Sequence, residues 1–86
     1  MARLPLTDGD RARGRALGQA LRAARGGRSQ ADVARAADVS LDTLRKVEQG
    51  GTPTPGFFVI ALLARELNLA LDDLACAVLP TEERRP

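Results

Sequence analysis

The chain has 86 residues and a formal net charge of +2, with 44% hydrophobic and 28% charged residues. This length suits one domain with a modest core, and the composition is typical of a globular protein. With no histidine and one cysteine, the sequence lacks imidazole bases and a convincing zinc-ligand set, so we expect no enzyme, no metal and no cofactor.

No apolar run approaches the length of about 18 residues that a membrane-spanning helix needs. The first residues lack the basic-then-apolar order of a signal peptide, so we expect a cytoplasmic protein without a membrane partner. The single cysteine, Cys76, cannot form an internal disulfide. Its place on an apolar helix face predicts a small core residue.

Charge is distributed unevenly along the chain. Residues 1–28 carry seven Arg against two Asp, a net +5, whereas residues 29–86 carry six basic against nine acidic residues, a net −3. A basic first third is the pattern expected of a surface that faces phosphates. A solvated amphipathic helix explains the same charges, and charge alone slightly favours that second interpretation.

Residues 1–7 are predicted to form a flexible arm, followed by a helix over 8–25. Thr7 suits its N-cap and Asp10 its third position, which is the pattern of a capping box. The core stripe of this helix contains Ala16, Leu17, Ala20, Leu21 and Ala24. Arg11, Arg15 and Arg22 fall on a different face, and Gly26–Gly27 ends the helix.

Two short helices are predicted next, over 30–37 and about 41–49. Ser29 and Ser40 suit their N-caps, and Leu44 and Val47 form a narrow apolar stripe on the second helix. Only Asp38 and Val39 remain for the turn between them, and Asp38 is predicted to adopt a positive φ. Gly50 suits a left-handed residue after the second helix.

A fourth helix is predicted over 57–67, with Thr54 as its N-cap and Pro55 at the first helical position. Its apolar stripe at helical spacing contains Phe57, Ile60, Leu63, Ala64 and Leu67, and Phe58 and Leu62 widen the apolar surface. Asn68 is predicted to end the helix. A fifth helix over 71–79 directs Leu71, Leu74, Ala75 and Val78 inward, and residues 80–86 are predicted to be a flexible tail. The sequence therefore predicts an all-α, compact five-helix bundle with one domain over 8–79.

Several of these residues together resemble the lambda-repressor/Cro-type helix-turn-helix family, also called the XRE family. They are Ser29–Gln30, Ala34, Val39–Ser40, Thr43–Leu44, Val47–Glu48, Gly50, Pro55, Leu67, Leu71 and Leu74. The resemblance covers about residues 17–74. It implies a transcriptional regulator, a homodimeric repressor, that binds double-stranded DNA and reads an inverted repeat with the helix over 41–49.

The resemblance also implies which residues contact bases: Gln30, Leu41, Asp42, Arg45 and Lys46. Leu41 can contact a thymine methyl, Asp42 can accept from cytosine N4, and Arg45 or Lys46 can donate to guanine O6 and N7. Gln30 can instead donate to a phosphate. Arg45 is the predicted main specificity determinant. The alternative is that the start of this helix is only a solvated face.

Phosphate contacts are implied for Ser29 and Thr43. The loop over 51–54 carries no Lys or Arg, although this family usually offers one there. The backbone N–H groups of Gly56 and Phe57 can bind a phosphate at a helix N-terminus. We expect the missing charge to come from the basic first third of the chain, namely from Arg11, Arg15, Arg22 or Arg28.

In this family an Arg of the first helix often pairs with the Glu that ends the reading helix, and here Arg25 or Arg22 is expected to orient Glu48. The candidates for a dimer interface are Leu69, Leu71, Val78 and Leu79, which suit the core equally well. Two alternative functions stay open: an antitoxin or adaptor whose main partner is another protein, such as a toxin, and a purely structural bundle.

Overall fold

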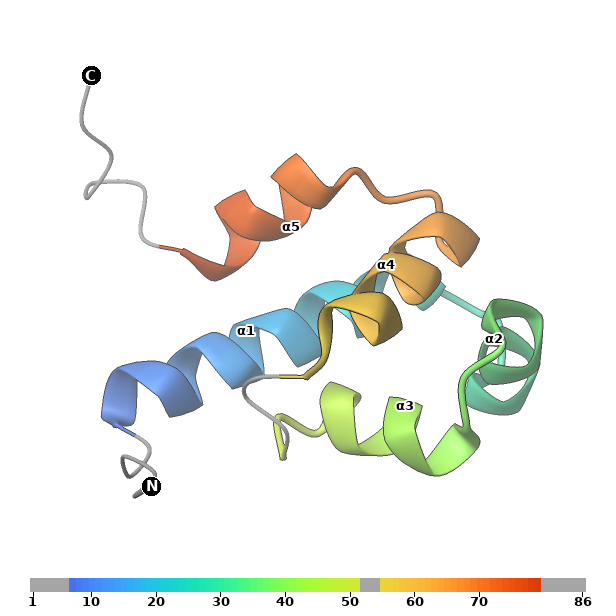
Figure 1. Cartoon of the computed structure of the whole chain (residues 1–86), viewed down its shortest axis with the longest axis horizontal. Helices are drawn as coiled ribbons and strands as arrows, with labels where there is room; N and C mark the ends of the chain where they lie inside the picture. The colour runs from blue at the N-terminus through green and yellow to red at the C-terminus, as the bar shows by residue number, and fades with distance from the viewer. Residues whose placement is uncertain (1–6, 52–54, 80–86) are drawn as a thin grey trace.

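The computed structural model describes residues 7–51 and 55–79. These residues form five helices: α1 (Asp8–Arg25), α2 (Gln30–Ala37), α3 (Leu41–Glu48), α4 (Phe57–Glu66) and α5 (Leu71–Val78) (Figure 1). The predicted all-α, five-helix fold is confirmed, and the helix bounds lie within one residue of their predictions except at the start of α4. The predicted arm, apart from Thr7, and the predicted tail lie outside the described residues.

Polar side chains begin the first three helices, as predicted. Thr7 Oγ1 accepts a hydrogen bond from the Asp10 N–H at 3.0 Å, and Asp10 Oδ2 accepts from the Thr7 N–H at 3.1 Å. The hydroxyls of Ser29 and Ser40 each accept from the third N–H of the helix that follows, both at 3.0 Å. These bonds satisfy backbone donors that a helix start leaves unpaired.

Left-handed residues follow three of the helices. They are Asp38 after α2 (φ 65°), Gly50 after α3 (φ 77°) and Asn68 after α4 (φ 60°). The N–H of the residue after each one donates back to the helix at 2.8–3.0 Å, which is the Schellman pattern. All three predicted helix ends are therefore confirmed.

α1 lies between α3 and α5 and contacts both, while α2 contacts α3 and α4 (Figure 1). The core comes from all five helices and contains Leu17, Leu21, Val33, Ala34, Ala37, Leu44, Val47, Leu63, Ala64 and Leu74. Because α2 and α3 each present one apolar stripe to this shared core, the outer faces of both helices are left to solvent.

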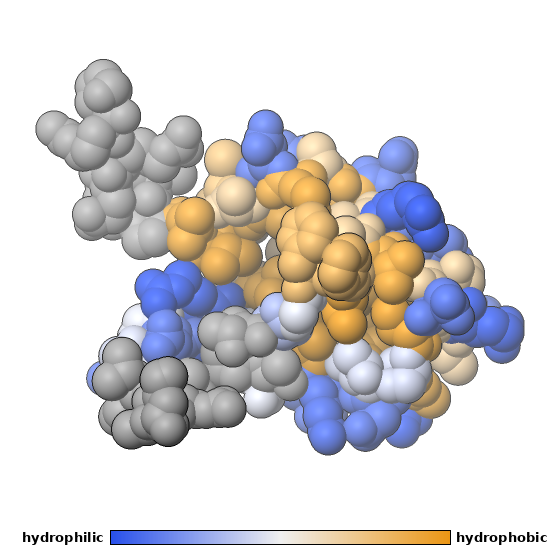
Figure 2. All heavy atoms as spheres, viewed as in Figure 1, coloured by the Kyte–Doolittle hydropathy of each residue, from blue (hydrophilic) through white to orange (hydrophobic). Residues whose placement is uncertain are grey.

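Some predicted core residues are exposed, and these predictions are wrong. Phe57 is 64% exposed and Leu71 is 45% exposed, and Ala75 and Cys76 are exposed as well. α5 buries only Leu74, because a helix of eight residues that packs on one neighbour turns most of its circumference outward. Figure 2 shows the resulting hydrophobic area on one face of the molecule.

The predicted start of α4 is also wrong. Gly56 is the N-cap, with an extended backbone (φ −63°, ψ 150°) and no side-chain hydrogen bond, so Pro55 precedes the cap and is not the first helical residue. Thr54, the predicted N-cap, lies outside the described residues. α4 therefore starts without a side-chain cap, and its first N–H groups have no such partner.

Candidate nucleic-acid interface

α3 has one anchored face and one open face. Leu44 and Val47 are buried, at 0% and 1% exposure, in the core shared by the helices. Asp42, Arg45 and Lys46 are exposed on the other side. Because an eight-residue helix is marginal by itself in water, this packing is what holds the three polar side chains in a fixed orientation.

α1 and α3 approach each other closely at Gly18. A Cβ atom placed on Gly18 would lie 2.5 Å from the Glu48 carbonyl oxygen and 2.6 Å from that of Val47. No side chain fits at that distance without a movement of the backbone. The glycine inside α1 therefore sets the position of the C-terminal end of α3. A glycine in a helix interior, which is normally unfavourable, is the sequence signal for such a contact.

Glu48 is the buried charged residue at this contact, with 6% exposure. Arg25 donates to both of its carboxylate oxygens, Nε to Oε2 and Nη2 to Oε1, each at 2.8 Å. Gln30 Nε2 donates to Oε1 at 3.0 Å. Arg25 Nη1 also donates to the Arg28 carbonyl at 2.8 Å. One guanidinium therefore links the end of α3 to the turn before α2.

Of the two arginines expected to orient Glu48, the structure brings Arg25 into direct contact. Arg22 Nε lies 4.0 Å from Glu48 Oε1, and its side chain is 67% exposed, against 15% for Arg25. Such an exposed, distant charge contributes little to stability. Arg25 is thus the residue that closes the α1–α3 contact.

Burial raises the pKa of Glu48, but the hydrogen bonds from Arg25 and Gln30, with the charges of Arg25 and Arg22, outweigh that effect and hold the pKa below its ordinary value of 4.5. The hydrogen bond with Glu48 raises the pKa of Arg25. Both groups are therefore charged at neutral pH. Charge-assisted, bidentate pairs of this kind fix geometry more strictly than neutral hydrogen bonds do.

The exposed side chains of α3 differ in their partners. Lys46 Nζ lies 3.2 Å from Asp42 Oδ2, one helical turn away. Arg45 makes no salt bridge with any residue that the structure describes. The Arg45 guanidinium is accordingly the group on this face that can take up an external acceptor without first giving up an internal one.

Leu41 and Gln30 are less open than the sequence suggests. Leu41 is half-buried and packs against the core, so part of its side chain faces away from solvent. Gln30 directs its amide nitrogen to Glu48. The sequence gives no local signal for this hydrogen bond, because the two residues are 18 positions apart.

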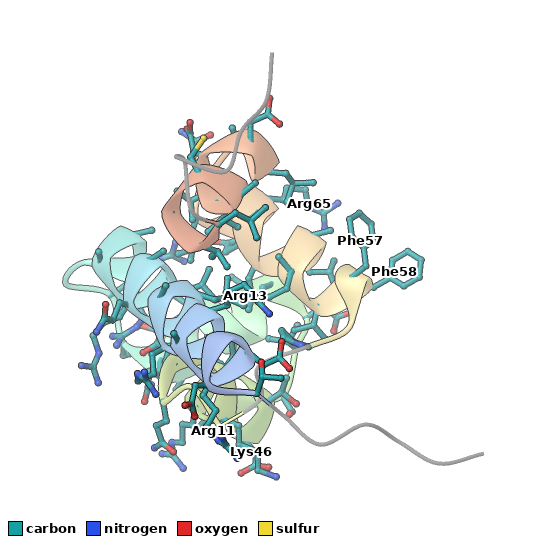
Figure 3. All side chains as sticks on the ribbon, turned by 90° about the vertical axis from the view of Figure 1, so that its left-hand side faces the viewer. Arg11, Arg13, Lys46, Phe57, Phe58 and Arg65 are labelled. Carbon is teal, nitrogen blue, oxygen red and sulfur yellow. The ribbon has the colours of Figure 1, made fainter. Side chains whose placement is uncertain are left out.

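The phosphate-contact candidates surround the ends of α3. Arg15 and Arg22 line a shallow hollow together with Gln19, Glu48 and Gln49. Arg11 lies at the same lower edge as Lys46 in Figure 3, and it is weakly paired with Asp8 at 3.4 Å. The N-terminal half of α1 therefore adds basic groups beside the C-terminal end of the exposed helix.

Three of the remaining candidates, Arg28, Thr43 and Ser29, are already engaged within the protein. Arg28 Nη2 donates to Glu66 Oε2 at 2.8 Å, a contact that the sequence analysis did not predict. The Ser40 hydroxyl donates to Thr43 Oγ1 at 2.7 Å, and Ser29 caps α2. Gly56 and Phe57 are exposed at the start of α4, which has no side-chain cap.

Among the described residues, no three His, Cys, Asp or Glu side chains lie close enough to hold a metal ion. No described helix is long and apolar enough to cross a membrane. The described part of the chain thus offers an exposed polar helix flanked by arginines as its most distinctive surface.

Comparison with known proteins gives one family. A model of the family described as a helix-turn-helix domain matches residues 16–77, which extends from within α1 almost to the end of α5. No curated protein matches the chain. The matched region contains α3, Glu48 and Arg25, but not Arg11 and Arg15.

Proposed function

Because the chain belongs to the helix-turn-helix domain family, in line with its resemblance to the lambda-repressor/Cro-type (XRE) proteins, we propose that it is a sequence-specific regulator of transcription. In this proposal it binds double-stranded DNA as a homodimeric repressor and reads an inverted repeat by placing α3 in the major groove.

The observation that carries the proposal is the two-sided character of α3. Its inner face is buried through Leu44 and Val47, and its end is fixed by the Arg25–Glu48 pair. Its outer face needs no partner for folding and exposes Arg45 and Lys46. A rigid helix with free polar side chains is what direct readout of base edges requires.

Arg45 is proposed as the main base-reading residue. Its guanidinium has two parallel N–H groups for guanine O6 and N7, and such a bidentate contact discriminates by about 1–3 kcal/mol. Lys46 must leave Asp42, but an exposed pair of this type costs little to break. Asp42, once released, can accept from cytosine N4. Leu41, half-buried, is proposed to contact a thymine methyl with its exposed part, and Gln30 is proposed to contact a base or phosphate beside α3.

Phosphate contacts are proposed for Ser29, Thr43, the N–H groups of Gly56 and Phe57, and the arginines Arg11, Arg15, Arg22 and Arg28. Arg15 and Arg22 already flank the end of α3. Each phosphate neutralised contributes about 0.9 to the salt slope of binding. The double variant Arg11→Gln/Arg15→Gln should therefore lower that slope by about 2, and an unchanged slope would remove these two residues from the interface.

The decisive experiment is selection of bound duplexes from a random pool at a stated salt concentration. The expected result is an inverted repeat whose half-sites contain a guanine that Arg45→Ala no longer selects. Arg65→Ala is the matched control, because Arg65 is also an exposed arginine but lies away from Lys46 in Figure 3. No enrichment for the wild-type chain, or an identical site for Arg45→Ala, would refute the proposal.

A further inference from the structure

Two adjacent phenylalanines at the start of α4 are exposed. Phe57 is 64% exposed and Phe58 is 79% exposed, and their rings meet edge to face at 5.7 Å. In Figure 3 both rings project from the end of α4, away from the rest of the molecule. Contiguous exposed apolar patches larger than a few hundred Å² mark interaction surfaces, and aromatic residues are enriched in the cores of interfaces.

This part of α4 carries no charge. The segment from Phe57 to Leu63 has no acidic or basic residue, and the first charge along this side of α4 is exposed Arg65, one turn beyond Ala61. By contrast, α5 has Asp72 and Asp73 in its first turn. A two-fold interface places a surface against a copy of itself, so a charged patch would face its own charge. An uncharged apolar patch avoids that repulsion and is therefore self-complementary.

The area is sufficient for the centre of an interface. With about 200 Å² for a Phe side chain, the two exposed fractions correspond to about 300 Å² on one copy. Two copies then supply about half of the roughly 1,200 Å² that a small specific interface buries. Half-buried Ala61 and Leu62, one turn further along α4, extend the same face.

The direction of the rings also suits a dimer on DNA. Phe57 and Phe58 project to the side of the molecule in Figure 3, whereas Arg11 and Lys46 lie at its lower edge. The two-fold axis of an inverted repeat passes through the DNA between the half-sites. The subunit contact must therefore come from a side face, next to the DNA-facing surface and not on it.

We propose that Phe57 and Phe58 form the centre of a homodimer interface, in which the rings of one copy pack against those of the second. This inference rests on the proposed function, because the inverted repeat is what requires two copies. The centre of the subunit contact is then Phe57 and Phe58, and not Leu71 and Leu79 at the two ends of α5.

The test is sedimentation equilibrium of the full chain without DNA, over a concentration series that reaches the millimolar range. Phe57→Ser/Phe58→Ser should weaken the dimer by about a hundredfold, because buried aromatic residues dominate interface energies. Leu71→Ser/Leu79→Ser is the matched control, since these side chains are 45% and 50% exposed, and it should leave the dimer unchanged. Circular dichroism should show equal helix content in all three proteins.

Three results would overturn the inference: a monomeric wild-type chain at every concentration, a phenylalanine variant that dimerises like wild type, or dissociation caused only by the α5 variant. Because no DNA is present, a dimer that the phenylalanine variant does not weaken would overturn this inference and leave the proposed DNA binding untouched, whereas a monomeric wild-type chain would also remove the homodimer from the proposed function. Under that function, the single variant Phe58→Ser, which leaves the proposed phosphate contact at Phe57 in place, should still bind a single half-site like wild type and lose only cooperative binding to the inverted repeat.

Discussion

Gly18→Ala should destabilise the protein, although alanine is the better helix former. The added methyl group would lie 2.5 Å from the Glu48 carbonyl oxygen and 2.9 Å from its carbon. Ordinary contact begins at 3.4 Å, so the backbones of α1 and α3 must separate by about 0.9 Å, the kind of shift that overpacking imposes. These neighbours are backbone atoms, which cannot rotate away as a flexible side chain can.

The magnitude follows from two opposing effects. Replacing an interior helical glycine by alanine gains about 1 kcal/mol in helix propensity. Overpacking a tight contact costs about 1–3 kcal/mol, and this contact lies at the upper end because backbone must move. We therefore expect a net loss of about 2 kcal/mol in the free energy of unfolding, or a decrease of about 10 °C in Tm for a domain of this size.

The assay is urea unfolding followed by circular dichroism, with Gly9→Ala as the matched control. Gly9 lies in the first turn of the same helix, and its added methyl group would meet only the Arg13 guanidinium and the Thr7 hydroxyl, at 3.4 Å or more. That variant should be at least as stable as wild type. If Gly18→Ala were equally stable, the close approach of α1 and α3 at this position would be refuted.

Further predictions concern the charge network and the turn. Arg25→Ala should lower the free energy of unfolding in urea by about 3–5 kcal/mol, because it leaves Glu48 buried without its partner. Arg22→Ala should change this free energy little, and equal effects of the two variants would contradict the assignment of Arg25 as the partner of Glu48. Folding lowers the pKa of Glu48 below 4.5, so the unfolded chain binds the proton more tightly than the folded chain does. The ionised Glu48 therefore stabilises the fold fully above pH 4.5, and this contribution is lost as the pH falls through the pKa of Glu48 in the folded protein. The check is thermal unfolding of Glu48→Gln between about pH 6 and pH 3, the range in which ordinary carboxyl groups titrate. The Tm of this variant should fall less with decreasing pH than the Tm of wild type. Asp38→Gly should raise Tm, with a gain of about 1 kcal/mol, because Asp38 has a φ of 65° and glycine adopts this conformation without steric cost; a lower Tm would mean that the Asp38 side chain stabilises the turn.

The helices and their ends were predictable because their signals are local. Thr7, Ser29 and Ser40 each precede an apolar stripe with helical spacing, and the hydrogen bonds that define their caps span only three residues. Asp38 and Gly50 were likewise predictable, since a two-residue turn or a helix stop requires a left-handed residue. The exposed position of Arg45 followed from the same periodicity, because the opposite face contains Leu44 and Val47.

What the sequence alone determined is therefore the secondary structure, the all-α class and the outer face of α3. Only the tertiary structure decided which arginine meets Glu48, that Gln30 joins it, and that Gly18 is where α1 and α3 touch, because these contacts join residues far apart in the chain. It also decided that Phe57, Leu71 and Cys76 are exposed. Periodicity identifies an apolar face of a helix but not whether a neighbour covers it, and the arrangement of all the helices determines that coverage.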